Sequence, residues 1–149
     1  MHSISTEIEI NCAPSQVRAT LLDFDNHPHW NPFFKSIRVL RGNSSDIKPG
    51  DQLEVVMQSN GGGSPMTFKP TVLRNDAEGF EWKGNLWSDW LFAGKHSFTF
   101  IDLDGGHKTR LVHSEQFTGL LVYALKYSLR DTPKDFAALN VALKETCEK

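Results

Sequence analysis

Two histidines and a glutamate, His96, His113 and Glu115, stand in two neighbouring segments of alternating apolar and polar residues. Imidazole is the side chain whose ordinary pKa lets it gain or lose a proton near neutral pH. A carboxylate beside an imidazole can orient it, stabilise its charged form or share its proton. These residue types can therefore act as general acid and general base on a bound hydroxyl or enolisable ketone.

The two segments that carry these residues are predicted to form a β-hairpin. Residues 92–103 and 109–117 are rich in phenylalanine, valine and threonine and alternate with a period of two, which is typical of strands. Residues 104–107 contain an aspartate and two glycines and predict the turn between them.

Antiparallel pairing about this turn places His96 opposite Glu115 and Phe98 opposite His113. Because alternate residues of a strand share a face, the histidines and the glutamate lie on the same face as the phenylalanines. That face is predicted to point inward. A buried carboxylate must be paired or protonated, and a histidine is its natural partner.

Three roles remain open for these residues. The pair of His96 and Glu115 can hold the hairpin together, orient a bound ligand, or move a proton on a substrate. A shift of register by one residue would turn the whole set outward. The residue types also suit a metal ion, but a metal site needs an open geometry that the sequence does not show, and no metal is predicted.

The elements around this hairpin follow from the same periodicity. The predicted strands are residues 4–10, 36–40, 53–58, 66–72, 80–84, 92–103 and 109–117. A helix is predicted from residue 14 to residue 22, and a short helical turn around residues 29–31. A long helical pattern follows residue 120, and Pro133 either starts a new helix or kinks a continuous one.

This order predicts an α+β fold. Consecutive strands joined by short loops form an antiparallel sheet, and the C-terminal helix is the large element available to cover its apolar face. If a curved sheet wraps the helix, the space between them can stay unfilled and hold a ligand. The chain shows no repeat or linker, so we predict one domain over residues 1–149.

Several short motifs, in this order and spacing, resemble those of the SRPBCC superfamily, which includes START-related proteins, pollen-allergen-like proteins and polyketide cyclases. The motifs lie at residues 13–17, 29–33, 68–72, 82–84, 92–98, 109–121 and 136–144. The resemblance implies a helix-grip fold, in which a curved antiparallel sheet wraps a long C-terminal helix, with two short helices after the first strand. It also implies a cavity for apolar metabolites, but no single activity, since members include carriers, receptors, cyclases and dehydratases.

We therefore predict a protein that binds or carries a small hydrophobic metabolite, without a cofactor. The alternative is a polyketide cyclase, dehydratase or isomerase of secondary metabolism that uses His96 and Glu115 as acid and base, with His113 beside them. Residues expected to line the ligand site are Trp30, Asn31, Leu53, Val55, Met57, Met66, Phe68, Trp82, Trp87, Trp90, Phe98, Phe136, Leu139 and Asn140.

Some of these residues have competing interpretations. Trp87 and Trp90 lie in an apolar segment that can form a lid over the cavity mouth or a patch that docks on a partner. Trp30 and Trp82 can be cavity wall or ordinary core. Asn31 can contact a ligand or only cap the short helix.

Asn140 lies on the predicted inner face of the last helix and can bond a ligand or a strand. Three other histidines, His27, His29 and His107, fall in predicted turns and are expected to be solvated.

The composition excludes some classes of protein. The net charge is −2, from 16 basic and 18 acidic residues, which argues against nucleic acid as a partner. No apolar run is long enough to span a membrane, and no secretory signal is visible, so a cytoplasmic protein is expected, as a monomer or homodimer. Cys12 and Cys147 are expected to be free thiols, although their positions do not exclude a bridge.

Overall fold

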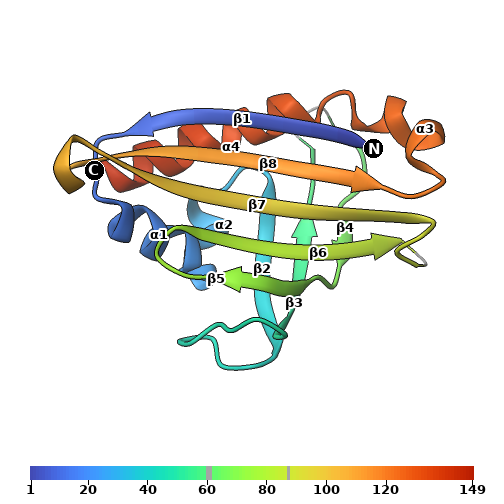
Figure 1. Ribbon diagram of the computed structural model, residues 1–149, viewed down its shortest axis with the longest axis horizontal. Helices are drawn as coiled ribbons and strands as arrows, with labels where there is room; N and C mark the ends of the chain where they lie inside the picture. The colour runs from blue at the N-terminus through green and yellow to red at the C-terminus, as the bar shows by residue number, and fades with distance from the viewer. Residues whose placement is uncertain (60–61, 87) are drawn as a thin grey trace.

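The computed structural model describes residues 1–59, 62–86 and 88–149. Within these ranges, eight strands form one antiparallel sheet in the order β1-β8-β7-β6-β5-β3-β2, with β4 paired to β3 (Figure 1). The strands are β1 (His2–Ile10), β2 (Phe34–Arg41), β3 (Gln52–Met57), β4 (Met66–Phe68), β5 (Thr71–Asn75), β6 (Gly79–Leu86), β7 (Phe92–Leu103) and β8 (Lys108–Thr118).

The helices lie on one side of this sheet. They are α1 (Pro14–Leu22), α2 (His27–Trp30), α3 (Val122–Leu125) and α4 (Thr132–Cys147), with single turns η1 (Phe24–Asn26), η2 (Asp104–Gly106) and η3 (Lys126–Leu129). The long helix α4 runs beside β1 and β8, while β2 and β3 cross the direction of the other strands, so the sheet is strongly curved (Figure 1). The predicted α+β helix-grip fold is confirmed.

The face that α4 turns toward the sheet is set by its apolar spacing. Phe136, Leu139, Leu143 and Cys147 recur every three or four residues, and all of them are buried. Pro133 stands in the first turn of α4, where its missing N–H costs no hydrogen bond. A new helix therefore begins here, and the residues before it form the separate short turns α3 and η3.

One predicted strand is divided in the structure. The run expected over residues 66–72 is split at Pro70 into β4 and β5. Proline has no N–H to give to a sheet, but its carbonyl oxygen still accepts a hydrogen bond of 3.0 Å from the Leu53 N–H. The break allows β3 to pair with both pieces, which helps the sheet to bend around the core.

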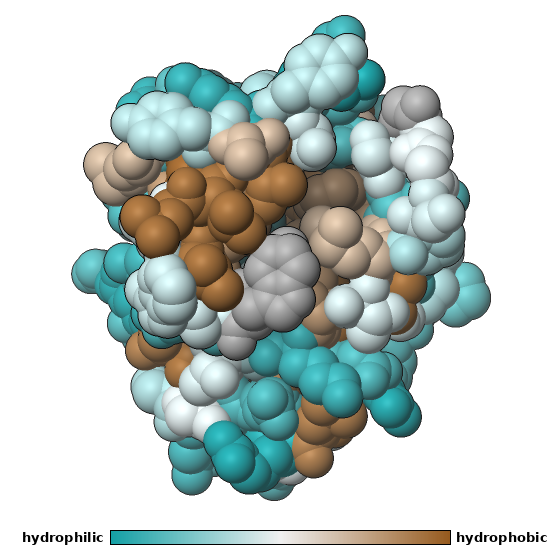
Figure 2. Space-filling model, turned by 90° about the vertical axis from the view of Figure 1, so that its right-hand side faces the viewer, coloured by the Kyte–Doolittle hydropathy of each residue, from teal (hydrophilic) through white to brown (hydrophobic). Residues whose placement is uncertain are grey.

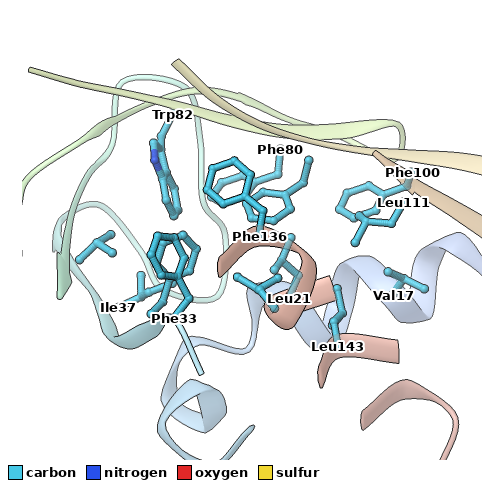
Figure 3. Close-up of a cluster of buried hydrophobic side chains, with 14 of the residues drawn as sticks. Val17, Leu21, Phe33, Ile37, Phe80, Trp82, Phe100, Leu111, Phe136 and Leu143 are labelled. Atoms are coloured by element: carbon cyan, nitrogen blue, oxygen red, sulfur yellow. The ribbon is translucent and has the colours of Figure 1, made fainter. Parts of the chain in front are cut away.

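Aromatic side chains fill the space between the sheet and α4. Trp82 and Phe80 point from β6 toward α4, which carries Phe136 (Figure 3). Phe98 of β7 packs on Trp82, and all four side chains are almost completely buried. Neighbouring rings pack edge-to-face, with the centroids of Phe80 and Trp82 5.6 Å apart. The expectation of an unfilled space is therefore wrong for this part of the interior, which is packed as a core.

The C-terminal end of α4 is tied to the connection between β1 and α1. The Cys12 thiol donates a hydrogen bond of 3.0 Å to the Cys147 carbonyl oxygen. The backbone N–H of Asn11 donates to the Glu148 carboxylate at 2.8 Å. Both cysteines are buried free thiols, as predicted. No helix in the described part of the chain is both long and apolar enough to cross a membrane.

The packing of α4 gives a direct test of the core. We expect Leu143→Ala to lower the free energy of unfolding by about 2 to 5 kcal/mol, because it leaves a cavity where a fully buried side chain stood. Urea denaturation followed by circular dichroism measures the change. The matched control is Val141→Ala on the exposed side of the same helix, which should alter stability by less than about 0.5 kcal/mol. Equal losses in the two variants would contradict this packing.

Candidate functional site

The hairpin of β7 and β8 has the register that the sequence predicts. His96 pairs with Glu115 and Phe98 with His113. On its other side, His96 pairs with Trp82 of β6. His96 and His113 are buried on the inner face of the sheet, opposite α4. The turn and the strict alternation of both strands are sufficient to bring the three predicted residues together.

A continuous chain of polar contacts runs through these residues. The Glu115 carboxylate lies 3.3 Å from His96 Nδ1, and His96 Nε2 lies 2.6 Å from His113 Nε2. His113 Nδ1 then lies 2.9 Å from Asn140 Oδ1 on α4. Asn140 Nδ2 donates to Thr6 Oγ1 at 2.9 Å, and Thr6 Oγ1 donates to the His113 carbonyl oxygen at 3.1 Å. The chain links three strands and the helix.

The hydrogen-bond partners assign the protons of the inner histidine. Asn140 Oδ1 can only accept, so His113 Nδ1 donates to it. Burial, aided by the neighbouring His96, lowers the pKa of His113 well below its ordinary value, so this imidazole is neutral. Its Nε2 therefore carries no proton and accepts from His96 Nε2–H.

The outer end of the chain pairs His96 with the Glu115 carboxylate. His96 Nδ1 lies 3.3 Å from Glu115 Oε1, a contact that is an ion pair when His96 is protonated. The Glu115 side chain is 16% exposed, whereas that of His96 is 3% exposed. Water and ligands therefore reach this pair from the Glu115 side.

The Glu115 carboxylate occupies space that is available only because residue 94 is a glycine. Gly94 precedes His96 on the same inner face of β7, and a Cβ atom built on it would collide with Glu115 Oε2. Gly94 pairs with Phe117, one pleat beyond Glu115. Close approach of the carboxylate to the strand is thus the physical reason for a glycine here.

Phenyl rings cover both faces of the inner histidine. The ring of His113 stacks on Phe136 with centroids 4.0 Å apart and on Phe98 with centroids 4.3 Å apart. His96 packs against Trp82 at 5.2 Å and Phe34 at 5.6 Å. The polar chain is therefore enclosed in an apolar shell, where its hydrogen bonds are strong and costly to leave unmade.

The other residues predicted for the ligand site fall into three groups. Leu53, Val55, Trp82, Phe98, Phe136, Leu139 and Asn140 are buried in the interior, whereas Trp30, Met57 and Phe68 are partly buried around it. Met66 and Trp90 are exposed at the surface. Trp87 lies outside the described residues.

Asn31 and Asn140 both bond protein groups. Asn31 Oδ1 accepts from the backbone N–H groups of Phe33 and Phe34 at 2.8 and 2.9 Å, so it organises the turn into β2. Asn140 bonds a strand through Thr6. Thr6 was not selected as a site residue from the sequence, although it lies on the same inner face of β1 as the buried Ile4 and Ile10.

The expectation that His27 is solvated is wrong, since it is completely buried. His27 Nε2 donates to the Leu21 carbonyl oxygen at 2.6 Å, and its Nδ1 accepts from Asn31 Nδ2 at 3.0 Å. Burial lowers its pKa. Aromatic residues three positions before and after it, Phe24 and Trp30, contact its ring and were the available signal of burial. The side chain stabilises the turn between α1 and β2.

A curved antiparallel sheet wrapped around a C-terminal helix, with polar residues on the enclosed face, defines a helix-grip protein. Residues 1–144 match the profile of the family described as "Polyketide cyclase / dehydrase and lipid transport", and the chain belongs to this family. The predicted membership of the SRPBCC superfamily is thereby confirmed. A search of curated protein sequences gives no significant match.

Solved structures share the fold over nearly the whole chain. The Zhui aromatase/cyclase from a Streptomyces species has a TM-score of 0.76 and 12% identity, over 99% of this chain and 93% of that one. Norcoclaurine synthase from Thalictrum flavum has a TM-score of 0.73 and 14% identity, over 99% and 94%. A START superfamily protein from Mycobacterium smegmatis has a TM-score of 0.69 and 19% identity, over 98% and 99%. At these identities the likeness establishes the fold alone.

The buried histidines predict how stability depends on pH. The native pKa values of His27 and His113 lie below 6.5, so the unfolded chain takes up protons that the native state does not. The stability from their neutral forms is complete above about pH 6.5 and is lost as the pH falls from there toward the lower native values. We expect the free energy of unfolding, measured by urea denaturation across this range, to decrease with acidity.

Replacing His113 alone measures its share of the pH dependence of stability. His113→Gln should flatten this pH dependence, even though the variant is less stable at every pH. His107→Gln is the matched control because His107 is exposed, and it should leave the pH dependence unchanged. The same slope in His113→Gln and in the unaltered protein would refute a neutral buried His113.

Proposed function

We propose that the protein binds a small hydrophobic molecule between the curved sheet and α4, as a binding or carrier protein. The observation that carries this proposal is the polar chain that ends at Glu115 within an aromatic interior. An apolar enclosure with one accessible polar group is the usual composition of a small-molecule site. The family, whose description includes lipid transport, supports the same class of ligand.

The chemistry of the walls specifies the kind of ligand. Trp82, Phe34 and Phe98 offer ring faces and edges that favour a flat, ring-containing molecule. A hydroxyl on that molecule can donate to the Glu115 carboxylate, and a carbonyl can accept from Glu115 in its protonated form. The site therefore suits an apolar ring system that carries one hydroxyl or carbonyl.

A ligand must open part of the packed interior. Phe92 and Phe117 stack with centroids 5.6 Å apart beside Glu115, and Phe92 is partly exposed. These rings stand where β7 begins and β8 ends, so they are the side chains that a ligand displaces first. Their apolar contacts with each other are replaced by contacts with the ligand, which limits the cost of opening.

A second candidate function is proton transfer, as in a cyclase, dehydratase or isomerase. It is favoured by the contact of the Glu115 carboxylate with His96 Nδ1, which puts an acid–base pair at the edge of the interior. An ionised Glu115 could remove a proton from the carbon beside a ligand carbonyl and return it to another atom of the same molecule. His113, covered on both faces, would act only by positioning His96.

The burial of the two histidines favours a binding function over a catalytic one. His96 and His113 are almost completely enclosed, and only the Glu115 carboxylate is open to a ligand. A hydrogen-bond chain of this kind fixes the orientation of one carboxylate, which is sufficient for recognition. Proton transfer by Glu115 alone lacks a second group that would polarise the ligand carbonyl.

Naphthol and naphthalene test the proposal as a matched pair of ligands, with and without a hydroxyl. Binding is measured by displacement of anilinonaphthalene sulfonate fluorescence. We expect naphthol to bind more tightly than naphthalene, and Glu115→Gln to weaken naphthol binding about tenfold with little effect on naphthalene, because a charge-assisted hydrogen bond is lost. The control Glu81→Gln removes a carboxylate from the outer face of the sheet and should change neither affinity.

A second variant separates the position of the carboxylate from its charge. Gly94→Ala keeps Glu115 but forces its carboxylate away from β7, so it should also reduce the preference for naphthol. Failure of the unaltered protein to bind either ligand, together with no small molecule seen by native mass spectrometry after purification, would refute the binding proposal. If a substrate is found that Glu115→Gln binds normally but no longer converts, the second candidate replaces the first.

A further inference from the structure

Large apolar and aromatic side chains are exposed together at one end of the molecule. Leu120 is 70% exposed, Tyr123 80%, Tyr127 74% and Trp90 65%. Figure 2 looks onto this end and shows hydrophobic side chains gathered on it. Single exposed apolar residues are normal, but a group of four large ones marks an interaction surface.

Backbone hydrogen bonds join the two segments that supply these residues. The Leu120 N–H donates to the Trp90 carbonyl oxygen at 3.0 Å, and the Leu121 N–H donates to the Leu91 carbonyl oxygen at 2.9 Å. The loop before β7 and the turns after β8 therefore form one continuous face. We call it the α3 surface and define it by Trp90, Leu120, Tyr123, Lys126, Tyr127 and Arg130.

The α3 surface carries two basic side chains, Lys126 and Arg130, and no acidic one, in a chain of net charge −2. The nearest acidic residues in the sequence are Asp131 and Asp89, and Asp89 is paired with Lys83. The Arg130 guanidinium lies 4.0 Å from the centroid of the Tyr127 ring. Basic and aromatic side chains are thus interleaved along this exposed stretch of the chain.

This combination matches the chemistry of a membrane surface. Tyrosine and tryptophan favour the boundary between headgroups and acyl chains, where an apolar ring and a polar tip are both satisfied. Leucine adds apolar area that inserts below the headgroups, and lysine and arginine attract anionic lipids. Tyr123, Lys126 and Tyr127 lie in the short turns α3 and η3, and Trp90, Leu120 and Arg130 lie in the segments beside them.

We propose that the α3 surface docks the protein on the face of a bilayer that contains anionic phospholipids. A second copy of the chain is a poorer occupant, because a two-fold contact centred on this surface would bring Lys126 and Arg130 of both copies close together. Anionic headgroups complement these charges. Docking would also set the end of the sheet that carries Glu115 toward the bilayer.

Sedimentation with lipid vesicles tests the docking. We expect the protein to sediment with vesicles of phosphatidylcholine mixed with phosphatidylserine, and much less with phosphatidylcholine alone. Lys126→Gln combined with Arg130→Gln should weaken partitioning about fivefold for each charge removed. Leu120→Ser combined with Tyr123→Ser should weaken it on the same vesicles without changing its dependence on salt, because these residues contribute apolar area and no charge.

Matched controls stand at the opposite end of the molecule, near η2 and the C-terminus (Figure 1). Lys108→Gln combined with Lys149→Gln removes the same charge there, and Ile101→Ser removes an exposed apolar side chain from β7. These variants should partition as the unaltered protein does. Thermal unfolding checks that every variant is folded.

Three results would overturn the proposal. The first is no binding of the unaltered protein to phosphatidylserine vesicles at low salt. The second is equal losses in the α3-surface variants and their controls. The third is a fall in oligomer size on Leu120→Ser with Tyr123→Ser while vesicle binding stays the same, which would assign the surface to a dimer. None of them bears on ligand binding in the interior, which has its own test.

Discussion

The hydrogen bond between His96 Nε2 and His113 Nε2, 2.6 Å long, is the contact on which the other features of the interior depend. Buried imidazoles must find partners, and each histidine here satisfies the other within an apolar shell. A shift of one residue between β7 and β8 would separate the rings, so the bond reinforces the register that the turn sets. Asn140 extends the same requirement to α4, because the face that its apolar residues turn toward the sheet also has to bring Asn140 to His113. The bond therefore couples the hairpin to the helix.

The parts of this arrangement that the sequence could predict are those with a short-range signal. Strand alternation and a glycine turn are local, and they were sufficient to place His96 opposite Glu115. The filling of the interior was not predictable in the same way, because it depends on how far the sheet closes on α4. The burial of His27 likewise follows from the packing of α1 and α2 against the sheet, and its one local signal was the spacing of Phe24 and Trp30 on either side of it. Asn140 was placed on the correct face of its helix, but its partner Thr6 lies at the other end of the chain.

Proteins that share this fold at 12 to 19% identity include an aromatase/cyclase, a norcoclaurine synthase and a START superfamily protein. The curved sheet and its helix are thus compatible with different activities, and function has to be argued from the side chains inside. In this chain those side chains are mostly aromatic, with one carboxylate near the surface. The enclosed histidines serve to hold that carboxylate in place. The ligand preference of the interior therefore depends on the neighbours of Glu115 as much as on Glu115 itself.

The contacts of Cys12 with Cys147 and of Asn11 with Glu148 have a consequence for motion. They clamp the last turn of α4 to the end of β1, whereas the first turn of α4, at Thr132, follows the short irregular turns of α3 and η3. A helix whose last turn is held by these contacts and whose first turn follows irregular segments can move most at that first turn. The first turn lies beside the start of β1 and the exposed residues of α3 and η3. Any widening of the interior would then be greatest there and smallest at the C-terminal turn, where Cys147 and Glu148 are held.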